Sequence, residues 1–169
     1  MLVGRATKLS EARSRRIDAR QIARGAHART GPRDWWDERR GRARNMSYSF
    51  YLPGELGFRL VQRLKSNQNL RGGNCSLWKS DLEQVNGWNQ DFESWGLEDV
   101  ELGWRLRRAG VEARLVVNRA ICMHLWHPAD RRESEAARAA YLATKARGLA
   151  WCPNGLEKRE KPPIVARAS

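Results

Sequence analysis

Glu98 and Asp99, two adjacent carboxylates in this 169-residue chain, are the strongest candidates for catalytic residues. They begin a run that is predicted to be a helix ending at Gly110, and a helix N-terminus stabilises ionised carboxylates. Adjacent helical residues point about 100° apart. One carboxylate can therefore act as a general base while its neighbour accepts a hydrogen bond from a substrate hydroxyl. The competing interpretation is that both are ordinary first-turn acids.

The residues around this pair favour a sugar as the ligand. Trp95 and Gly96 directly precede the two acids, and Trp88 and Trp104 lie close in the sequence. An aromatic face can stack on the C–H face of a sugar ring while carboxylates take its hydroxyls. Core packing is the alternative for each tryptophan, and we prefer it for Trp104.

A second group of interest contains His124 and His127, which follow Cys122 in a predicted strand-to-loop region. Their spacing can direct a histidine toward a metal ion, but core or surface roles are commoner for two isolated histidines. Cys122 is expected to be a small buried side chain. The sequence contains no complete metal site and no glycine loop of the Walker or dinucleotide type.

The elements that must position these residues are only partly marked in the sequence. Ser80 and Glu83 match a capping box at the start of a short helix that Gly87 ends. Residues 26–45 show no clean period and are interpreted as a loosely packed connection or a docking segment. The tail is expected to fray from residue 158. The other expected elements are helices at 10–24 (capped by Ser10), 56–65 and 130–147, and short strands within 113–123.

Charge is spread unevenly along the chain. It holds 32 Lys and Arg residues and 19 Asp and Glu residues, which gives a net charge of +13. Residues 71–128, in contrast, hold 7 basic and 8 acidic residues. Residues 1–44 hold 13 basic and 5 acidic residues. This flank could bind nucleic acid, anionic lipid or a phosphorylated ligand, or it could be a solvated helix surface. No run of 18 apolar residues and no signal peptide is recognisable. The three cysteines suit reduced thiols better than a disulfide framework.

Three ordered blocks then carry a family resemblance: residues 72–82 (GGNCSLWKSDL), 85–92 (VNGWNQDF) and 95–102 (WGLEDVEL). Together with the segment that ends at His127, they resemble the acceptor-side half of inverting GT-A glycosyltransferases. The likeness is to bacterial family 2 enzymes and to the galactosyltransferase C-terminal domain, and its convincing part covers residues 71–128.

The resemblance implies a role for each matching residue. Asp99 matches the catalytic base that deprotonates the acceptor hydroxyl. The other implied roles are acceptor binding by Glu98, Trp95 and Gly96, donor approach by Gly73 and Asn74, and binding of a divalent metal, Mn or Mg, by His124, with His127 as second choice.

Two departures from the family pattern matter. Leu97 stands where the family has a glycine, and it places a bulky side chain where backbone would approach ligand. No Asp-x-Asp metal motif occurs in the chain, and no parallel βαβ pattern precedes residue 71. The family's nucleotide-binding half is therefore expected to be missing or supplied by a separate polypeptide, and the metal is not expected to be retained.

The expected fold is α+β: the C-terminal half of a GT-A fold, mostly helical with a few short strands. We divide the chain into a basic helical segment (1–70), an acceptor and catalytic module (71–128) and a C-terminal helix and tail (129–169). Residues 71–128 are expected to be the ordered core, and the basic segment is expected to pack poorly without a sheet partner.

The function implied by the resemblance is hexosyl transfer from a nucleotide-sugar donor to a saccharide or glycolipid acceptor, in cell-surface polysaccharide or lipopolysaccharide synthesis. The expected location is cytoplasmic, with peripheral contact to the inner face of the membrane, and no nucleic acid partner is expected. The alternative is a non-catalytic basic protein that contacts nucleic acid or anionic membrane.

Overall fold

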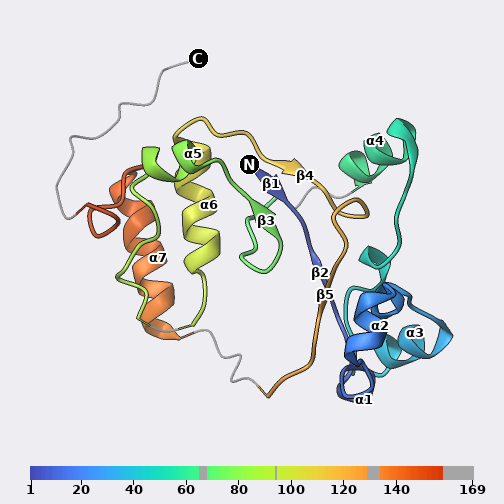
Figure 1. The fold of residues 1–169 in the computed structure, drawn as a ribbon. Helices are drawn as coiled ribbons and strands as arrows, with labels where there is room; N and C mark the ends of the chain where they lie inside the picture. The colour runs from blue at the N-terminus through green and yellow to red at the C-terminus, as the bar shows by residue number, and fades with distance from the viewer. Residues whose placement is uncertain (65–67, 94, 129–133, 158–169) are drawn as a thin grey trace. The chain divides into compact units, whose positions relative to one another are not determined.

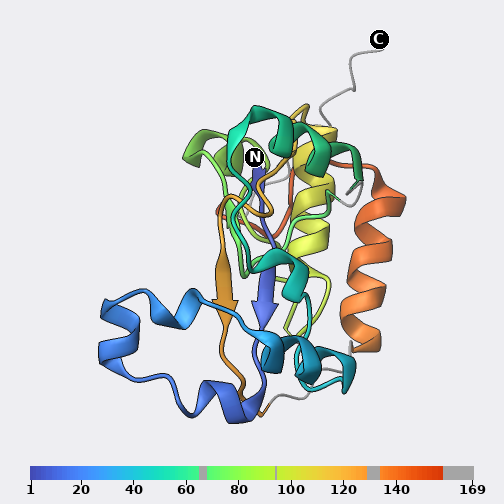
Figure 2. The same ribbon diagram turned by 90° about the vertical axis from the view of Figure 1, so that its right-hand side faces the viewer.

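The computed structural model describes residues 1–64, 68–93, 95–128 and 134–157, and its fold mixes helices with small sheets (Figures 1 and 2). The chain forms two compact units, each discontinuous in sequence. The first contains Met1–Leu2, Gln68–Arg114 and Asp130–Ser169; the second contains Val3–Asn67 and Leu115–Ala129. The α+β class is confirmed at this level. The functional division at residues 70 and 128 stays a prediction.

The strands are short. β1 (Leu2–Val3), β3 (Cys75–Ser76) and β4 (Arg114–Leu115) form a three-stranded sheet in the order β3-β1-β4. β2 (Ala6–Lys8) pairs in parallel with β5 (Cys122–His124). β4 and β5 confirm the strands expected within 113–123.

Three helices belong to the first unit: α5 (Lys79–Gln84), α6 (Glu98–Arg108) and α7 (Glu135–Arg147). α6 and α7 lie side by side in both views (Figures 1 and 2). The predicted helix at 98–110 is confirmed, and the helix at 130–147 is confirmed from residue 135 onward. Residues 129–133 and the tail from residue 158 lie outside the described residues.

The predicted capping box at Ser80 is wrong. α5 begins two residues earlier than that box requires, its N-cap is Trp78, and no side chain caps it. Ser80 is therefore already inside the helix. The Glu83 carboxylate pairs instead with Lys79, with 3.4 Å between Nζ and Oε1, so it does not return to the N-cap backbone.

The second unit carries four α-helices and two short 3-10 turns in its described residues. They are α1 (Glu11–Ser14), α2 (Ala19–Ala23), η1 (Ala26–Ala28), α3 (Pro32–Arg39), η2 (Met46–Tyr48) and α4 (Gly54–Leu64). α4 confirms the helix expected at 56–65. α3 gives regular structure to part of the 26–45 segment, for which the sequence indicated no period.

The single helix expected from Ser10 to Arg24 is two helices in the structure. Ser10 caps α1 as predicted, because its hydroxyl accepts from the Arg13 amide. Asp18 then adopts an extended backbone and caps α2 by accepting from the Gln21 amide at 2.7 Å. A residue in extended conformation cannot continue the preceding helix, so the second cap separates the two.

The expectation that the basic segment packs poorly is wrong for its first ten residues. Thr7 is fully buried in β2, which is paired along its length with β5. Leu9 forms a buried cluster with Ala43 and Met46. A parallel strand partner thus comes from the C-terminal side of the chain, which periodicity in residues 1–70 could not reveal. No helix in the described part of the chain is both long and apolar enough to cross a bilayer.

Candidate active site

The N-terminus of α6 is built on a tight turn that Glu98 closes. Leu97, the N-cap residue, has φ 65° and ψ −3°, in the left-handed region, and its carbonyl accepts from the Glu101 amide at 2.8 Å. Gly96 has φ 121°. The Glu98 Oε2 accepts from the Gly96 amide at 2.9 Å. One oxygen of Glu98 is therefore used to hold the turn that presents Asp99.

Asp99 contacts the glycine turn expected on the donor side. Its Oδ2 accepts from the Gly72 amide at 3.1 Å, across a separation of 27 residues. The turn is closed by a bond from the Asn74 amide to the Arg71 carbonyl, 3.1 Å long. The structure thus brings the predicted base within one or two residues of Gly73 and Asn74.

A close contact one helical turn further along α6 explains this approach. A Cβ added to Gly103 would lie 2.7 Å from the Cβ of Leu70, a distance that real side chains do not adopt. Leu70 is fully buried. The absence of a side chain at Gly103 therefore lets the chain before Gly72 lie directly against the helix that carries Asp99. Sequence reasoning missed this residue, because Gly103 gives no local signal in a helical pattern.

The fold itself does not require glycine at Gly72 or Gly73. Neither has a positive φ. An added Cβ at Gly72 would make an ordinary 3.9 Å contact with the Asp99 Cβ, and one at Gly73 would meet nothing within 4 Å. The missing side chains leave this backbone open to close approach by another molecule.

The three tryptophans near the acids lie close in the sequence, but in the described part of the structure they do not form an aromatic cluster. Trp88 and Trp95 are exposed, and within the described ranges neither ring contacts the other or that of Trp104. Trp104 is half-buried, and the Arg108 guanidinium lies 5.4 Å from its ring centroid. Trp95 is 58% exposed, so its face is available to a ligand.

Cys75 lies beside the same carboxylate, with its Sγ 4.0 Å from the Gly72 carbonyl oxygen. Burial raises the pKa of the Cys75 thiol, and the negative charge of Asp99 raises it further. Thiolate is the nucleophilic form of cysteine. Cys75 is therefore a neutral thiol and lacks the activation that a nucleophile needs.

The two histidines belong to the second unit. His124 lies in β5 and its carbonyl accepts from the Leu9 amide at 3.0 Å. Its ring centroid is 5.2 Å from that of His127, whose Nδ1 lies 3.1 Å from the Pro128 carbonyl oxygen. Among the described residues no three His, Cys, Asp or Glu side chains gather as a metal site would need. Cys122 is half-buried, not buried as expected.

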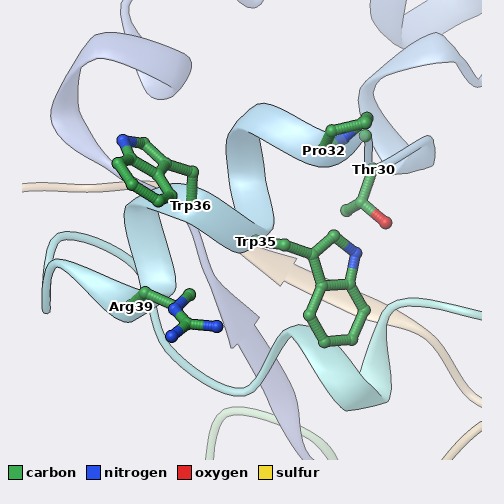
Figure 3. Close-up of a pocket in the computed structure, with 6 residues that line it drawn as sticks. Thr30, Pro32, Trp35, Trp36 and Arg39 are labelled. Atoms are coloured by element: carbon green, nitrogen blue, oxygen red, sulfur yellow. The ribbon is translucent and has the colours of Figure 1, made fainter.

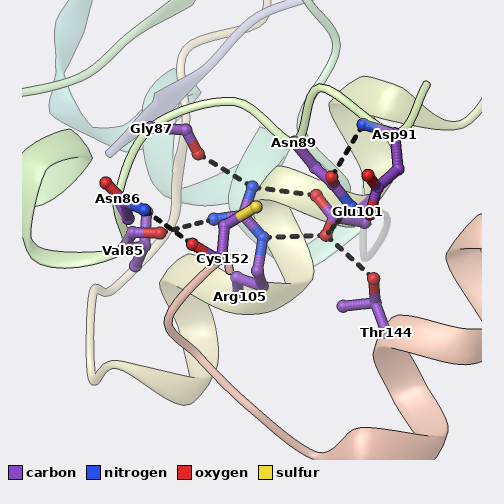
Figure 4. Close-up of polar contacts among 9 residues, drawn as sticks. All are labelled: Val85, Asn86, Gly87, Asn89, Asp91, Glu101, Arg105, Thr144 and Cys152. Carbon is purple, nitrogen blue, oxygen red and sulfur yellow. Dashed lines mark hydrogen bonds and ion pairs between the residues drawn. The ribbon is translucent and has the colours of Figure 1, made fainter. Parts of the chain in front are cut away.

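Sequence reasoning also missed a buried ion pair inside α6 (Figure 4). Arg105 lies near the end of the helix, where a basic residue complements the helix dipole, but it and Glu101 are each only 1% exposed. Arg105 Nε and Nη2 donate to the two Glu101 oxygens at 2.8 and 2.9 Å. The guanidinium also donates to the carbonyls of Val85 and Gly87, at 2.8 and 2.9 Å.

The pair is the centre of a larger polar network in the first unit. The Thr144 hydroxyl of α7 donates to Glu101 at 3.1 Å. Asn86, buried in the turn after α5, donates to the Cys152 carbonyl at 2.6 Å and accepts from the Glu157 amide at 2.8 Å. These bonds fix α6 against α7 and the following loops, and so hold the helix whose first turn carries the candidate base.

The left-handed conformation of Leu97 leads to a test. The Leu97→Gly variant should be more stable than the Leu97→Ala variant by about 1 kcal/mol, because a Cβ is unfavourable at positive φ. At an ordinary helical site the order is reversed: Ala139→Gly in exposed α7 should cost about 1 kcal/mol. Urea unfolding of the three variants measures this, and an alanine that matches or exceeds glycine at position 97 would rule out the strain.

Comparison with known proteins finds a family match over the stretch that contains these residues. Residues 56–128 match a family model described as the N-terminal domain of galactosyltransferase. The match contains the whole 71–128 stretch and ends just beyond His127. Because the matching family is an N-terminal domain, the expectation of a C-terminal, acceptor-side half stays a proposal.

Two curated relatives match over a shorter stretch. Each is a validoxylamine A glucosyltransferase, one from Streptomyces hygroscopicus subsp. jinggangensis (strain 5008) and one from subsp. limoneus, and each is 47% identical over 38 residues. That stretch is 22% of this chain, but 9% of the first relative and 8% of the second. No solved structure matches the chain. Residues 56–128 therefore form a glycosyltransferase-like segment.

Proposed function

We propose that the chain is the acceptor-side part of an inverting glycosyltransferase that uses Asp99 as its base. The observation that carries this proposal is the 3.1 Å hydrogen bond between Asp99 and the Gly72 amide. It joins a carboxylate at a helix N-terminus to a turn whose two central residues, Gly72 and Gly73, have no side chains to obstruct a ligand. The match of residues 56–128 to a galactosyltransferase family model supports the same assignment.

In the proposed reaction, Asp99 takes the proton of an acceptor hydroxyl as its oxygen attacks the anomeric carbon of the donor sugar. A new C–O bond forms, and the bond to the nucleoside diphosphate breaks with its electron pair on the leaving group. Gly73 and Asn74 face the donor side. The exposed Trp95 ring and the Gly96 backbone provide a surface for the acceptor, and Glu98 accepts from one of its hydroxyls.

The divalent metal expected in the complete enzyme, Mn or Mg, remains a proposal, with His124 as one ligand and His127 as second choice. The described residues do not fit a complete metal site, and the sequence holds no Asp-x-Asp motif. A nucleotide-binding half with an Asp-x-Asp motif would have to supply the remaining ligands.

The finer assignment follows from the resemblance in the sequence. We propose GT-A family 2 membership, a hexosyl donor, and a saccharide or glycolipid acceptor in cell-surface polysaccharide or lipopolysaccharide synthesis. The proposed location is the cytoplasm, against the inner face of the membrane. The alternative of a non-catalytic basic protein rests on the flank at residues 1–44, which the family match does not reach.

The 169 residues alone are expected to transfer sugar slowly or not at all, because stabilising a departing diphosphate needs a firmly held metal. The measurement is nucleoside diphosphate release from UDP-hexoses, with and without an added polypeptide that carries the Asp-x-Asp half. Rapid transfer by the chain alone would refute this expectation. If no transfer appears with the added half either, the transferase proposal itself fails.

A further inference from the structure

The acidic and basic side chains of α3, in the second unit, face different ways. Asp34 and Asp37 are buried, and Glu38 is half-buried. Each acid accepts a hydrogen bond from within the unit. Asp34 accepts from the Gly31 amide at 2.9 Å and Asp37 from the Ser10 hydroxyl at 2.8 Å. Glu38 accepts from the Met46 amide at 3.0 Å. The negative charge of this helix is therefore directed into the protein.

The exposed side of the same helix is aromatic and cationic. Trp35 and Trp36 are 42% and 53% exposed, which is unusual for two large apolar rings in sequence. The exposed arginines that accompany them are Arg33, Arg39 and Arg40. The Arg40 guanidinium lies 4.8 Å from the Trp36 ring centroid. This surface is suited to a ligand that has both an apolar face and negative charge.

The surface also carries a shallow, open pocket. A pocket of about 420 Å³ is lined by Thr30, Gly31, Pro32, Trp35, Trp36 and Arg39. That volume lies within the range of small-ligand sites. Figure 3 shows the Trp35 indole beside Thr30 and Pro32, with the Arg39 guanidinium one turn further along α3. The Thr30 hydroxyl is 2.8 Å from the Ser49 hydroxyl, and a hydroxyl keeps further hydrogen-bonding capacity beyond one such contact.

We propose that this pocket binds an anionic saccharide unit, a sugar ring that carries a carboxylate or a phosphate. The indole of Trp35 stacks on the C–H face of the ring. The planar guanidinium of Arg39 takes the anionic group, since its paired N–H donors match carboxylate and phosphate geometry. The choice of a saccharide over other anions rests on the proposed transferase function. The pocket would hold a charged glycan on the second unit, whereas Asp99 belongs to the first.

The structure favours this ligand over two other anionic partners. A membrane-surface helix buries a broad apolar face, whereas the described residues of α3 expose two tryptophans among arginines, around a shallow, open pocket. Single-stranded nucleic acid needs an extended groove with stacking positions for several bases. One pocket beside a helix of eight residues fits a single sugar ring better.

The test is calorimetric titration of the full chain with a galacturonate trisaccharide, a neutral galactose trisaccharide and glucose 1-phosphate. The charged trisaccharide should bind more tightly than the neutral one, and glucose 1-phosphate shows whether phosphate replaces carboxylate. Arg39→Gln should weaken the charged probes about tenfold, as expected for a hydrogen bond to a charged group, and leave the neutral probe unchanged. Trp35→Ala should weaken all of the probes that bind.

The matched control is Arg33→Gln, because Arg33 is exposed on the same helix but does not line the pocket; it should bind like the unsubstituted protein. Equal weakening by both glutamine variants would overturn the proposal, and so would equal binding of charged and neutral trisaccharides. Tighter binding of oligothymidylate or of phosphatidylglycerol vesicles, lost in Trp35→Ala, would assign the surface to those partners instead. Each readout is independent of sugar transfer, so failure here leaves the proposed activity intact.

Discussion

Asp99→Asn is expected to lower the rate of sugar transfer by roughly 10²–10⁴-fold, the range typical of a general base. The amide has no basic oxygen to take the proton of the acceptor hydroxyl. The assay is transfer kinetics with the polypeptide that supplies the Asp-x-Asp half. The fold should be preserved, because the asparagine carbonyl oxygen can still accept from the Gly72 amide that Asp99 contacts.

The control for this experiment is Asp81→Asn, since Asp81 is a first-turn acid of α5 in the same unit. It removes the same charge from a helix N-terminus and should leave the transfer rate nearly unchanged. Glu98→Gln should mainly raise KM for the acceptor, because its bond to the Gly96 amide can be kept by the glutamine carbonyl. A near-full rate for Asp99→Asn would make Asp99 a structural first-turn acid.

The parts of the fold that could be predicted are those with local signals. The acids at the start of α6, the basic residues near its end and the glycine beyond it all lie within one short stretch, and the helix has the expected bounds. The positions of Asp99 and Glu98 in its first turn follow directly. The helices at 54–64 and 135–147 were predictable for the same reason.

The parts that could not be predicted depend on contacts between distant residues. An arginine near a helix C-terminus is usually solvated, and only the carbonyls of Val85 and Gly87 make burial of Arg105 possible. The contact of Gly103 with Leu70 spans 33 positions and has no signal in either segment. The pairing of β2 with β5 joins strands that lie more than 110 positions apart in the sequence, with Ala6 opposite Cys122. A sequence pattern within a short stretch of residues cannot reveal any of these long-range contacts.

The buried Arg105 leads to the second large expected effect. Arg105→Met should destabilise the protein by about 3–5 kcal/mol, because it leaves the Glu101 carboxylate buried without its counter-ion. The Thr144 hydroxyl, 3.1 Å away, would remain as a partner but carries no charge. A loss of this size is a large fraction of the free energy of unfolding of a typical domain, which is roughly 5–15 kcal/mol. Urea unfolding followed by circular dichroism measures it.

The matched control is Arg59→Met in α4. Arg59 and Glu55 have the same residue types, order and four-residue spacing as the buried pair, but their side chains are 75% and 68% exposed. Exposed pairs contribute about 0–1 kcal/mol, so this variant should be nearly neutral. Similar losses for both arginines would mean that burial does not set the cost.

A double variant, Glu101→Leu with Arg105→Met, separates the unpaired charge from the other bonds of the network. It should be more stable than Arg105→Met alone, because no buried carboxylate is left without a partner. It should remain below the unsubstituted protein by about 1–3 kcal/mol, since the Val85 and Gly87 carbonyls lose their donor. If the double variant transfers sugar normally with the added half, the network acts only through stability. If transfer falls while the fold is kept, Arg105 is a positioning residue, because it ties α6 to the loop after α5 and so orients Asp99.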